Sequence, residues 1–241
     1  MKNELEIIQS RSLPIVFKLA ETGYSDPEND MEFVNGTYFL VEFENRFYIV
    51  SAVHNISDYP ENSLRFTDKE FNCEPFHIGH RYSVESPEDE DHEDLLILEI
   101  LMEKAEPNHA ANIEERAYKL PPKELELTNN DTLYIIGCPK KLSKDAPAIE
   151  SDPNEKTISL VRATLECNYI YSNDQDQLKQ VHLTEACSLG GMSGSPVYKY
   201  DLNSSNFIIA GILLRGGNSS SPSAYAHFLH VRVLYNALKQ I

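Results

Sequence analysis

Residues 190–196 read Gly-Gly-Met-Ser-Gly-Ser-Pro and are followed directly by the apolar pair Val197-Tyr198. Glycine adopts backbone conformations that other residues avoid, so glycines on both sides of Ser193 allow a tight turn that exposes the serine hydroxyl. The same turn lets the backbone approach a bound carbonyl group, which is the geometry that a nucleophilic serine needs. A plain Gly/Ser turn is the competing interpretation of this segment taken alone.

A serine hydroxyl is a weak nucleophile at neutral pH unless a histidine accepts its proton and a carboxylate orients that histidine. His54 follows the run Ile49-Val50-Ser51-Ala52-Val53, at the end of a predicted strand, where its ring can face a cleft. Asp94 ends an acidic stretch and directly precedes the apolar run Leu95-Leu96-Ile97-Leu98. A carboxylate at the entrance to a buried strand is costly unless it has a partner such as the imidazole N–H. We therefore predict His54 as the base and Asp94 as the orienting acid.

Three blocks, Val50–His54, Asp94–Leu98 and Gly191–Pro196, resemble the triad blocks of the trypsin-like (chymotrypsin-fold) serine peptidases, in the order His, Asp, Ser that this family uses. Further segments are similar to strands and a turn of that fold: Gly36–Val41, Gly137–Pro139 and Ala210–Ile212. The resemblance implies an all-β fold of two antiparallel six-stranded β-barrels, with the active site in the cleft between them and a short C-terminal helix.

The resemblance also implies a function. It predicts a serine endopeptidase that hydrolyses a protein or peptide substrate through a Ser-His-Asp triad and an acyl-enzyme, without a cofactor. The implied oxyanion hole consists of the backbone N–H groups of Gly191 and Ser193. Cys187, at the base of the implied primary pocket, carries no fixed charge, which predicts cleavage after uncharged side chains of medium or large size. The other implied substrate-binding residues are Ser188, Leu213, Leu214, Arg215 and Gly216, and Arg215 is expected to favour acidic or polar groups at an adjacent subsite.

The chain departs from the family pattern in two places: the usual aromatic residue of the substrate-pairing strand is replaced within residues 213–216, and the residue directly before the nucleophile differs. Secreted members carry an aspartate directly before the nucleophile, which pairs with a new N-terminal amine after zymogen cleavage, whereas this chain has Met192. We therefore expect no activation by that salt bridge. Met192 is expected to pack in the barrel, with the turn ordered by other contacts or by an activating protein partner.

Composition limits the function classes. The chain has 241 residues, of which 41% are hydrophobic and 24% charged, which is typical of a globular protein. No apolar stretch is long enough to span a bilayer, and the formal charge of −17 disfavours nucleic acid and anionic membranes as partners. The charged start, residues 1–6, lacks the pattern of a secretory signal, so we expect a cytoplasmic, intracellular bacterial-type member of the family.

The cysteines and histidines do not suggest a metal centre. Four widely spaced cysteines, Cys73, Cys138, Cys167 and Cys187, are expected to be thiols in a reducing compartment. Together with the histidines they match no zinc-binding spacing, so we predict no metal site.

Short β-branched and aromatic runs alternate with polar turn segments along the chain, as in all-β proteins. We predict an N-terminal barrel over residues 1–120, which carries His54 and Asp94, and a C-terminal barrel over residues 121–241, which carries Ser193 and the specificity pocket. Residues 103–118 are expected to be a connection and residues 142–156 an exposed, mobile loop. The predicted strands are 14–20, 37–44, 46–52, 95–102, 132–137, 158–165, 180–183, 195–199, 206–214 and 224–228, followed by a helix over 231–241.

Two alternatives of a different class remain open. The chain could be a catalytically silent trypsin-like scaffold that acts as a binding module, because a fold does not itself guarantee activity. It could also be a protease effector of a bacterial stress or phage-defence system that a sensor protein switches on.

Overall fold

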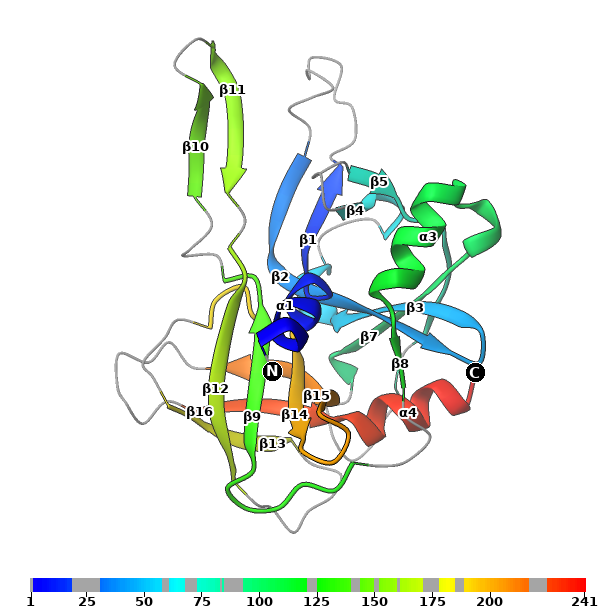
Figure 1. Cartoon of the computed structure of the whole chain (residues 1–241). Coiled ribbons are helices and arrows are strands. Elements are labelled where there is room, and N and C mark those ends of the chain that lie inside the picture. Colours follow the sequence, from blue (N-terminus) through cyan, green and yellow to red (C-terminus); the bar gives the residue numbers. More distant parts are fainter. Residues whose placement is uncertain are drawn as a thin grey trace.

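The structure, a computed structural model, describes residues 2–18, 31–57, 61–67, 73–82, 84, 93–120, 125–139, 144–149, 152–159, 161–170, 178–184, 189–216 and 225–241. Two β-systems lie side by side in it, one formed by strands up to residue 119 and the other by strands from residue 132 onward (Figure 1). Their strands are almost entirely antiparallel. The Thr37 N–H of the first β-system donates to the Ser193 carbonyl at 2.9 Å, so the two β-systems are in contact at the turn that carries Ser193.

The first β-system is one sheet with the strand order β5-β4-β1-β2-β3-β7-β6, and β8 pairs in parallel with β2. Its strands are β1 (Leu13–Lys18), β2 (Met31–Phe43), β3 (Arg46–Ala52), β4 (Leu64–Thr67), β5 (Cys73–Pro75), β6 (Ile78–Tyr82), β7 (Leu95–Ile100) and β8 (Tyr118–Lys119). Short 3-10 helices interrupt the connections at η1 (Val53–Asn55), η2 (Glu61–Ser63) and η3 (Met102–Lys104).

The second β-system is a closed six-stranded barrel with the order β12-β13-β16-β15-β14-β9. Its strands are β9 (Thr132–Gly137), β12 (Ala163–Ile170), β13 (Lys179–Leu183), β14 (Pro196–Asp201), β15 (Asn206–Gly216) and β16 (Tyr225–His230). A separate two-stranded sheet, β10 (Lys144–Ile149) with β11 (Asp152–Ser159), projects away from the barrel. The described part of the chain also contains the α-helices α1 (Lys2–Ser10), α3 (Pro107–Arg116) and α4 (Val231–Lys239).

Among the residues that the structure describes, buried apolar side chains form three clusters. One lies within the first sheet and includes Leu40 and Ile49, and one fills the closed barrel and includes Val181 and Phe228. The third joins residues of both β-systems, so the two halves share a core. Burial of this apolar surface is the main stabilising contribution to such a fold. The predicted all-β fold with a C-terminal helix is confirmed, and the arrangement is consistent with the predicted two-barrel architecture: the second half is a closed six-stranded barrel, whereas the first half is an eight-stranded sheet that forms a half-barrel.

Several elements follow directly from local sequence. The predicted strands 37–44 and 46–52 form a hairpin, β2–β3, which turns at Glu44 and Asn45, whose φ angles are 50° and 63°. Two consecutive positive φ angles are typical of the tight turn whose twist matches that of antiparallel strands. The C-terminal helix buries Val231, Leu234 and Leu238 on one face, as their spacing predicts.

Three predictions about the connections were wrong. Residues 107–116 form helix α3 rather than a connection, since Pro107 stands at the start of the helix, where its missing N–H costs nothing. The segment predicted as a mobile loop contains the paired strands β10 and β11. The predicted strand 158–165 is in fact the end of β11 and the start of β12.

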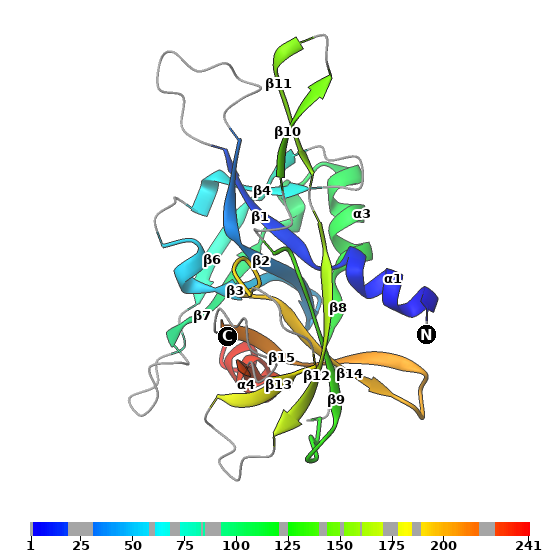
Figure 2. The same ribbon diagram turned by 90° about the vertical axis from the view of Figure 1, so that its left-hand side faces the viewer.

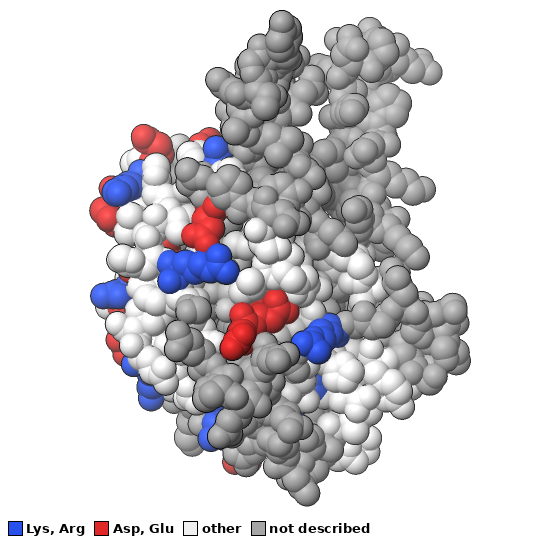
Figure 3. Space-filling view, turned by 180° about the vertical axis from the view of Figure 1, so that it is seen from behind, with Lys and Arg blue, Asp and Glu red and all other residues white. Residues whose placement is uncertain are grey.

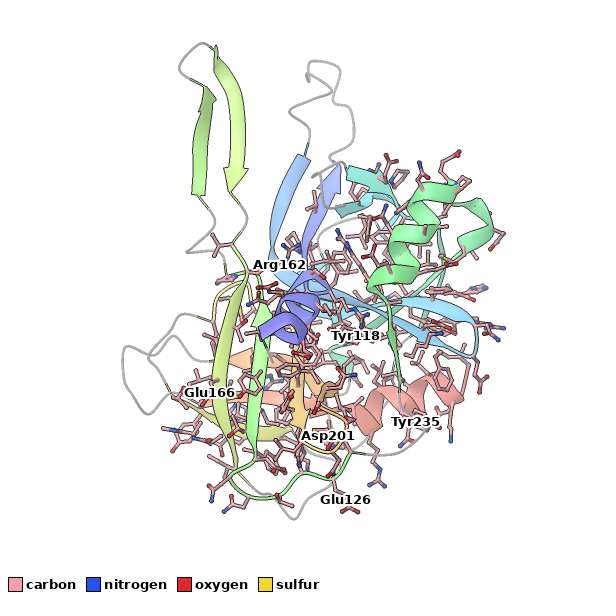
Figure 4. All side chains as sticks on the ribbon, viewed as in Figure 1. Tyr118, Glu126, Arg162, Glu166, Asp201 and Tyr235 are labelled. Atoms are coloured by element: carbon pink, nitrogen blue, oxygen red, sulfur yellow. The ribbon has the colours of Figure 1, made fainter. Side chains whose placement is uncertain are left out.

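Helix α1 links the two β-systems (Figure 2). Its residue Ile8 is 3% exposed and belongs to the shared apolar cluster, while Gln9 Nε2 donates a hydrogen bond to Thr164 Oγ1 of the barrel at 2.9 Å. Ser12 lies just after the helix, and its carbonyl accepts a hydrogen bond from Arg162 Nε at 2.8 Å. Arg162 and Tyr118 both lie near this helix in Figure 4, and the Tyr118 hydroxyl is hydrogen-bonded to that of Tyr198. The junction is therefore held by polar contacts as well as by apolar packing.

Acidic and basic side chains are interspersed over the described part of the face shown in Figure 3, which carries no continuous basic patch there. Among the described helices, none is both long and apolar enough to cross a membrane.

Candidate active site

Two neighbouring strands bring His54 and Asp94 together. Strand β3 ends at Ala52 and β7 begins at Leu95, and these two residues are paired in the antiparallel ladder. The end of one strand therefore lies beside the start of the other, and the next residues on each side must meet. The Val53 N–H donates to the Asp94 carbonyl at 2.8 Å, which continues the ladder into η1.

The Asp94 carboxylate makes three hydrogen-bond contacts with His54. Its Oδ2 lies 2.7 Å from His54 Nδ1, its Oδ1 lies 3.0 Å from the same nitrogen, and Oδ1 also accepts the His54 backbone N–H at 3.0 Å. The Asp94 side chain is 19% exposed and that of His54 is 50% exposed. The carboxylate is thus largely shielded, while the imidazole is accessible to solvent or to a bound molecule.

Ser193 lies in a turn that depends on glycine. Gly191 and Gly194 have φ angles of 88° and 81°, in the region that disfavours other residues. Hydrogen bonds within the turn run from Met192 N to the Leu189 carbonyl at 2.9 Å and from Ser195 N to the Met192 carbonyl at 3.0 Å. Strand β15 fixes the turn further. Gly194 N donates to the Leu213 carbonyl at 2.7 Å, and Leu213 N donates to the Ser195 carbonyl at 2.8 Å.

The two serines of this turn differ in accessibility. Ser193 is partly exposed, whereas Ser195 is 0% exposed and its Oγ faces Gly137 so closely that an added Cβ there would lie 1.9 Å away. Only Ser193 can meet a substrate without rearrangement of the core. This difference supports the assignment made from the sequence motif.

The next feature is the pair of backbone N–H groups, those of Gly191 and Ser193, that the sequence predicts as an oxyanion hole. Within the described parts of the chain, neither the Gly191 N–H nor the Ser193 N–H donates to an acceptor. Met192, between them, is 0% exposed and packs in the apolar core of the barrel, as predicted. The turn is therefore ordered without an acidic residue at this position.

The described residues contain no hydrogen bond between the His54 ring and the Ser193 hydroxyl. Such contacts are often long in unliganded enzymes and tighten when substrate binds. Other groups link the two chain segments, since Thr37 N and Asn55 Nδ2 each donate to the Ser193 carbonyl at 2.9 Å.

Sequence reasoning missed the roles of Thr37 and Asn55 and of their neighbour Ser51. A signal was present: Thr37 directly precedes the apolar run 38–41, Ser51 lies within the run 47–53, and Asn55 directly follows the predicted base. All three are at most 4% exposed. A buried polar side chain needs a hydrogen-bond partner, so its presence in an apolar run points to a tertiary contact.

The predicted substrate-binding residues fall into two groups. Cys187 and Ser188 lie outside the described residues. Leu213 and Leu214 are each 1% exposed, so their side chains pack in the apolar clusters, whereas Arg215 on the same strand is exposed. Gly216 is the last residue of β15.

Two cysteine side chains, those of Cys138 and Cys167, lie among the residues that the structure describes. Cys138 and Cys167 are buried free thiols, and burial raises the pKa of Cys138 to about 11, so it stays protonated at neutral pH. In the described ranges no three His, Cys, Asp or Glu side chains are grouped so that they could hold a metal ion.

Replacement of Gly194 by alanine should destabilise the protein strongly. The added Cβ would lie 2.1 Å from the Thr37 carbonyl oxygen and 2.4 Å from Ser51 Oγ, and the positive φ is unfavourable for alanine. The backbone conformation alone costs about 1–3 kcal/mol. Gly79→Ala is the matched control, because its nearest neighbour is the end of the flexible Leu101 side chain. Urea unfolding should show a much larger loss for Gly194→Ala, and equal losses would contradict this account of the turn.

The comparisons with known proteins identify one family. Residues 36–203 match the family model of the trypsin-like peptidase domain. The matched segment contains His54, Asp94 and Ser193. No curated protein matches the chain significantly.

Proposed function

Because the chain belongs to the trypsin-like peptidase family, and is in general terms a serine protease, we propose that it hydrolyses peptide bonds with Ser193 as nucleophile, His54 as general base and Asp94 as the orienting acid. The observation that carries this proposal is the contact between His54 Nδ1 and Asp94 Oδ2 at 2.7 Å. It ties the imidazole to a shielded carboxylate through Nδ1–H, so the unprotonated Nε2 of the neutral ring is able to accept a proton.

The proposed reaction proceeds through an acyl-enzyme. His54 Nε2 takes the proton of the Ser193 hydroxyl while Oγ attacks the carbonyl carbon of the substrate, and the negative charge passes to the carbonyl oxygen. The N–H groups of Gly191 and Ser193 stabilise that charge, and one such donor typically contributes about 10² to 10³ in rate. Protonated His54 then gives its proton to the leaving amine, and water hydrolyses the ester in a second, equivalent step.

A fluorophosphonate probe tests this function without knowledge of the substrate. The probe reacts with serines that an imidazole activates, so the folded protein should acquire one label. Peptide mapping by mass spectrometry should locate it on Ser193. Label on another serine, or none in folded protein, would contradict the proposed function. A silent binding scaffold, the alternative, is not favoured by a His-Asp pair with this geometry.

The side-chain preference of the enzyme follows from the proposed pocket. Cys187 offers no charge at the proposed base of the pocket, so we expect cleavage after uncharged side chains of medium or large size. Arg215, which is exposed on β15, should favour acidic or polar groups at an adjacent subsite. Profiling of cleavage on a proteome-derived peptide library measures both preferences. A dominant Lys, Arg or Glu directly before the cut would contradict the first of them.

A further inference from the structure

Three polar side chains of the first β-system are buried against the nucleophile turn. Thr37 on β2 is 0% exposed, Ser51 on β3 is 1% exposed and Asn55 at the end of η1 is 4% exposed. They contact one another: Ser51 Oγ donates to the Thr37 carbonyl at 2.7 Å, and Asn55 Nδ2 donates to Ser51 Oγ at 3.2 Å. We call these three residues the clamp.

The clamp binds two carbonyl groups of the turn. Thr37 Oγ1 donates to the Gly191 carbonyl at 2.9 Å and accepts the Cys138 N–H at the same distance. The Ser193 carbonyl accepts two hydrogen bonds, one from Thr37 N and one from Asn55 Nδ2, both at 2.9 Å. The carbonyls of Gly191 and Ser193, the two neighbours of Met192, are therefore both bound by the first β-system.

These contacts fix the peptide planes around Ser193. The C=O and N–H groups of a trans peptide point in opposite directions, so a plane is fixed when both are bonded. The plane after Gly191 is held by Thr37 at its C=O and by the Leu189 carbonyl at its N–H. The plane after Ser193 is held by the clamp at its C=O and by the Leu213 carbonyl at its N–H.

The plane between these two carries the amide that matters for chemistry. Its C=O, from Met192, accepts the Ser195 N–H at 3.0 Å, so its N–H, that of Ser193, points the other way. That N–H has no acceptor among the described residues. With both neighbouring planes fixed, it cannot rotate to find one elsewhere.

Asn55 also connects the clamp to the base. It directly follows His54 in η1, and the His54 backbone N–H donates to the Asp94 carboxylate at 3.0 Å. One short segment therefore holds the carboxylate on one side and the Ser193 carbonyl on the other. The relative position of base and nucleophile depends on this segment.

We propose that Thr37 and Asn55 are positioning residues, whose hydrogen bonds to the Gly191 and Ser193 carbonyls keep the oxyanion-binding amide of Ser193 in its catalytic orientation without a zymogen-type salt bridge. The inference rests on the proposed function. Neither residue touches the substrate, and each acts through the backbone of the turn. The clamp orders the nucleophile turn in this chain, which has Met192 instead of an aspartate directly before the nucleophile.

The test compares the fluorophosphonate labelling rates of five proteins: wild type, Thr37→Val, Thr37→Ser, Asn55→Ala and Tyr198→Phe. Circular dichroism shows the temperature range in which each is folded, and labelling is measured within it. Thr37→Val removes the hydroxyl at constant volume, and Thr37→Ser restores it. Tyr198→Phe is the matched control, because it removes another buried hydroxyl from the shared core. If Thr37→Val does not fold, Thr37→Ala takes its place, since it leaves room for water.

Thr37→Val and Asn55→Ala should label about 10²-fold more slowly than wild type, the loss typical of one oxyanion-hole donor. Thr37→Ser should recover most of the rate, and Tyr198→Phe should label like wild type even if it melts earlier. Rates equal to wild type in folded Thr37→Val and Asn55→Ala would overturn the inference while leaving the proposed function intact. Equal slowing in Tyr198→Phe would also overturn it, because the effect would then be general loosening. Failure of wild type to label would refute the proposed function itself.

Discussion

Ser193→Ala should lose all fluorophosphonate labelling and all turnover above background. The expected loss in kcat is about 10⁶-fold, the size found when a serine peptidase loses its nucleophile. The only other serine of the motif, Ser195, is fully buried beside Gly137 and cannot replace it. The substitution should leave stability nearly unchanged, because Ser193 is partly exposed and its carbonyl contacts do not involve the side chain.

Ser195→Ala is the matched control for this experiment. Its hydroxyl has no hydrogen-bond partner among the described residues, so its removal leaves no unpaired donor behind. The variant should label at the wild-type rate and on the same peptide. If Ser193→Ala kept its labelling, or if Ser195→Ala lost it, the assignment of the nucleophile would be wrong.

Asp94→Asn should lower kcat about 10⁴-fold with little change in folding. In the wild type, two oxygens accept two N–H groups of His54, one from the backbone and one from Nδ1. An amide has one carbonyl oxygen and one NH₂ group. If its oxygen keeps the backbone N–H, its NH₂ faces Nδ1, which must then give up its proton. The proton moves to Nε2, and that nitrogen can no longer accept the Ser193 proton.

Glu93→Gln is the control for the loss of one acidic group at this position. Glu93 is the adjacent residue and is exposed, so its substitution changes the net charge equally without touching the imidazole. Steady-state kinetics on a substrate found by library profiling would measure both variants. A loss below tenfold in Asp94→Asn would show that the carboxylate does not set the tautomer of His54.

Much of the fold could be predicted because its signals are local. The turn at Glu44 and Asn45 lies between two apolar runs, and α4 has its apolar residues on one face. The three triad blocks are short continuous segments, so a family pattern can find them. The assignment of roles to His54, Asp94 and Ser193 nevertheless stays a proposal until the chemistry is measured, and the division of the chain near residue 120 stays a prediction.

The rest could not be read from neighbouring residues. Helix α3 is a polar stretch that begins with a proline, and such a stretch resembles a connection until the burial of Ile113 and Arg116 is seen. The clamp was missed because its partners are far apart in sequence: 154 residues separate Thr37 from Gly191, and 138 separate Asn55 from Ser193. Whether a polar residue in a strand finds such a partner depends on how the two β-systems meet.

The docking of α1 has a consequence for the order of events during protein synthesis. The helix is made before every strand of the barrel, yet it packs against β9 and β15, and Gln9 donates a hydrogen bond to Thr164, which lies 155 residues later in the chain. Contacts of such long range slow folding, since the ends of a long chain must meet before any gain is realised. The helix must therefore wait on the ribosome until the strands of the barrel have emerged. For the same reason the nucleophile turn gains its partners only when most of the chain exists, so nascent chains should carry no proteolytic activity toward their surroundings.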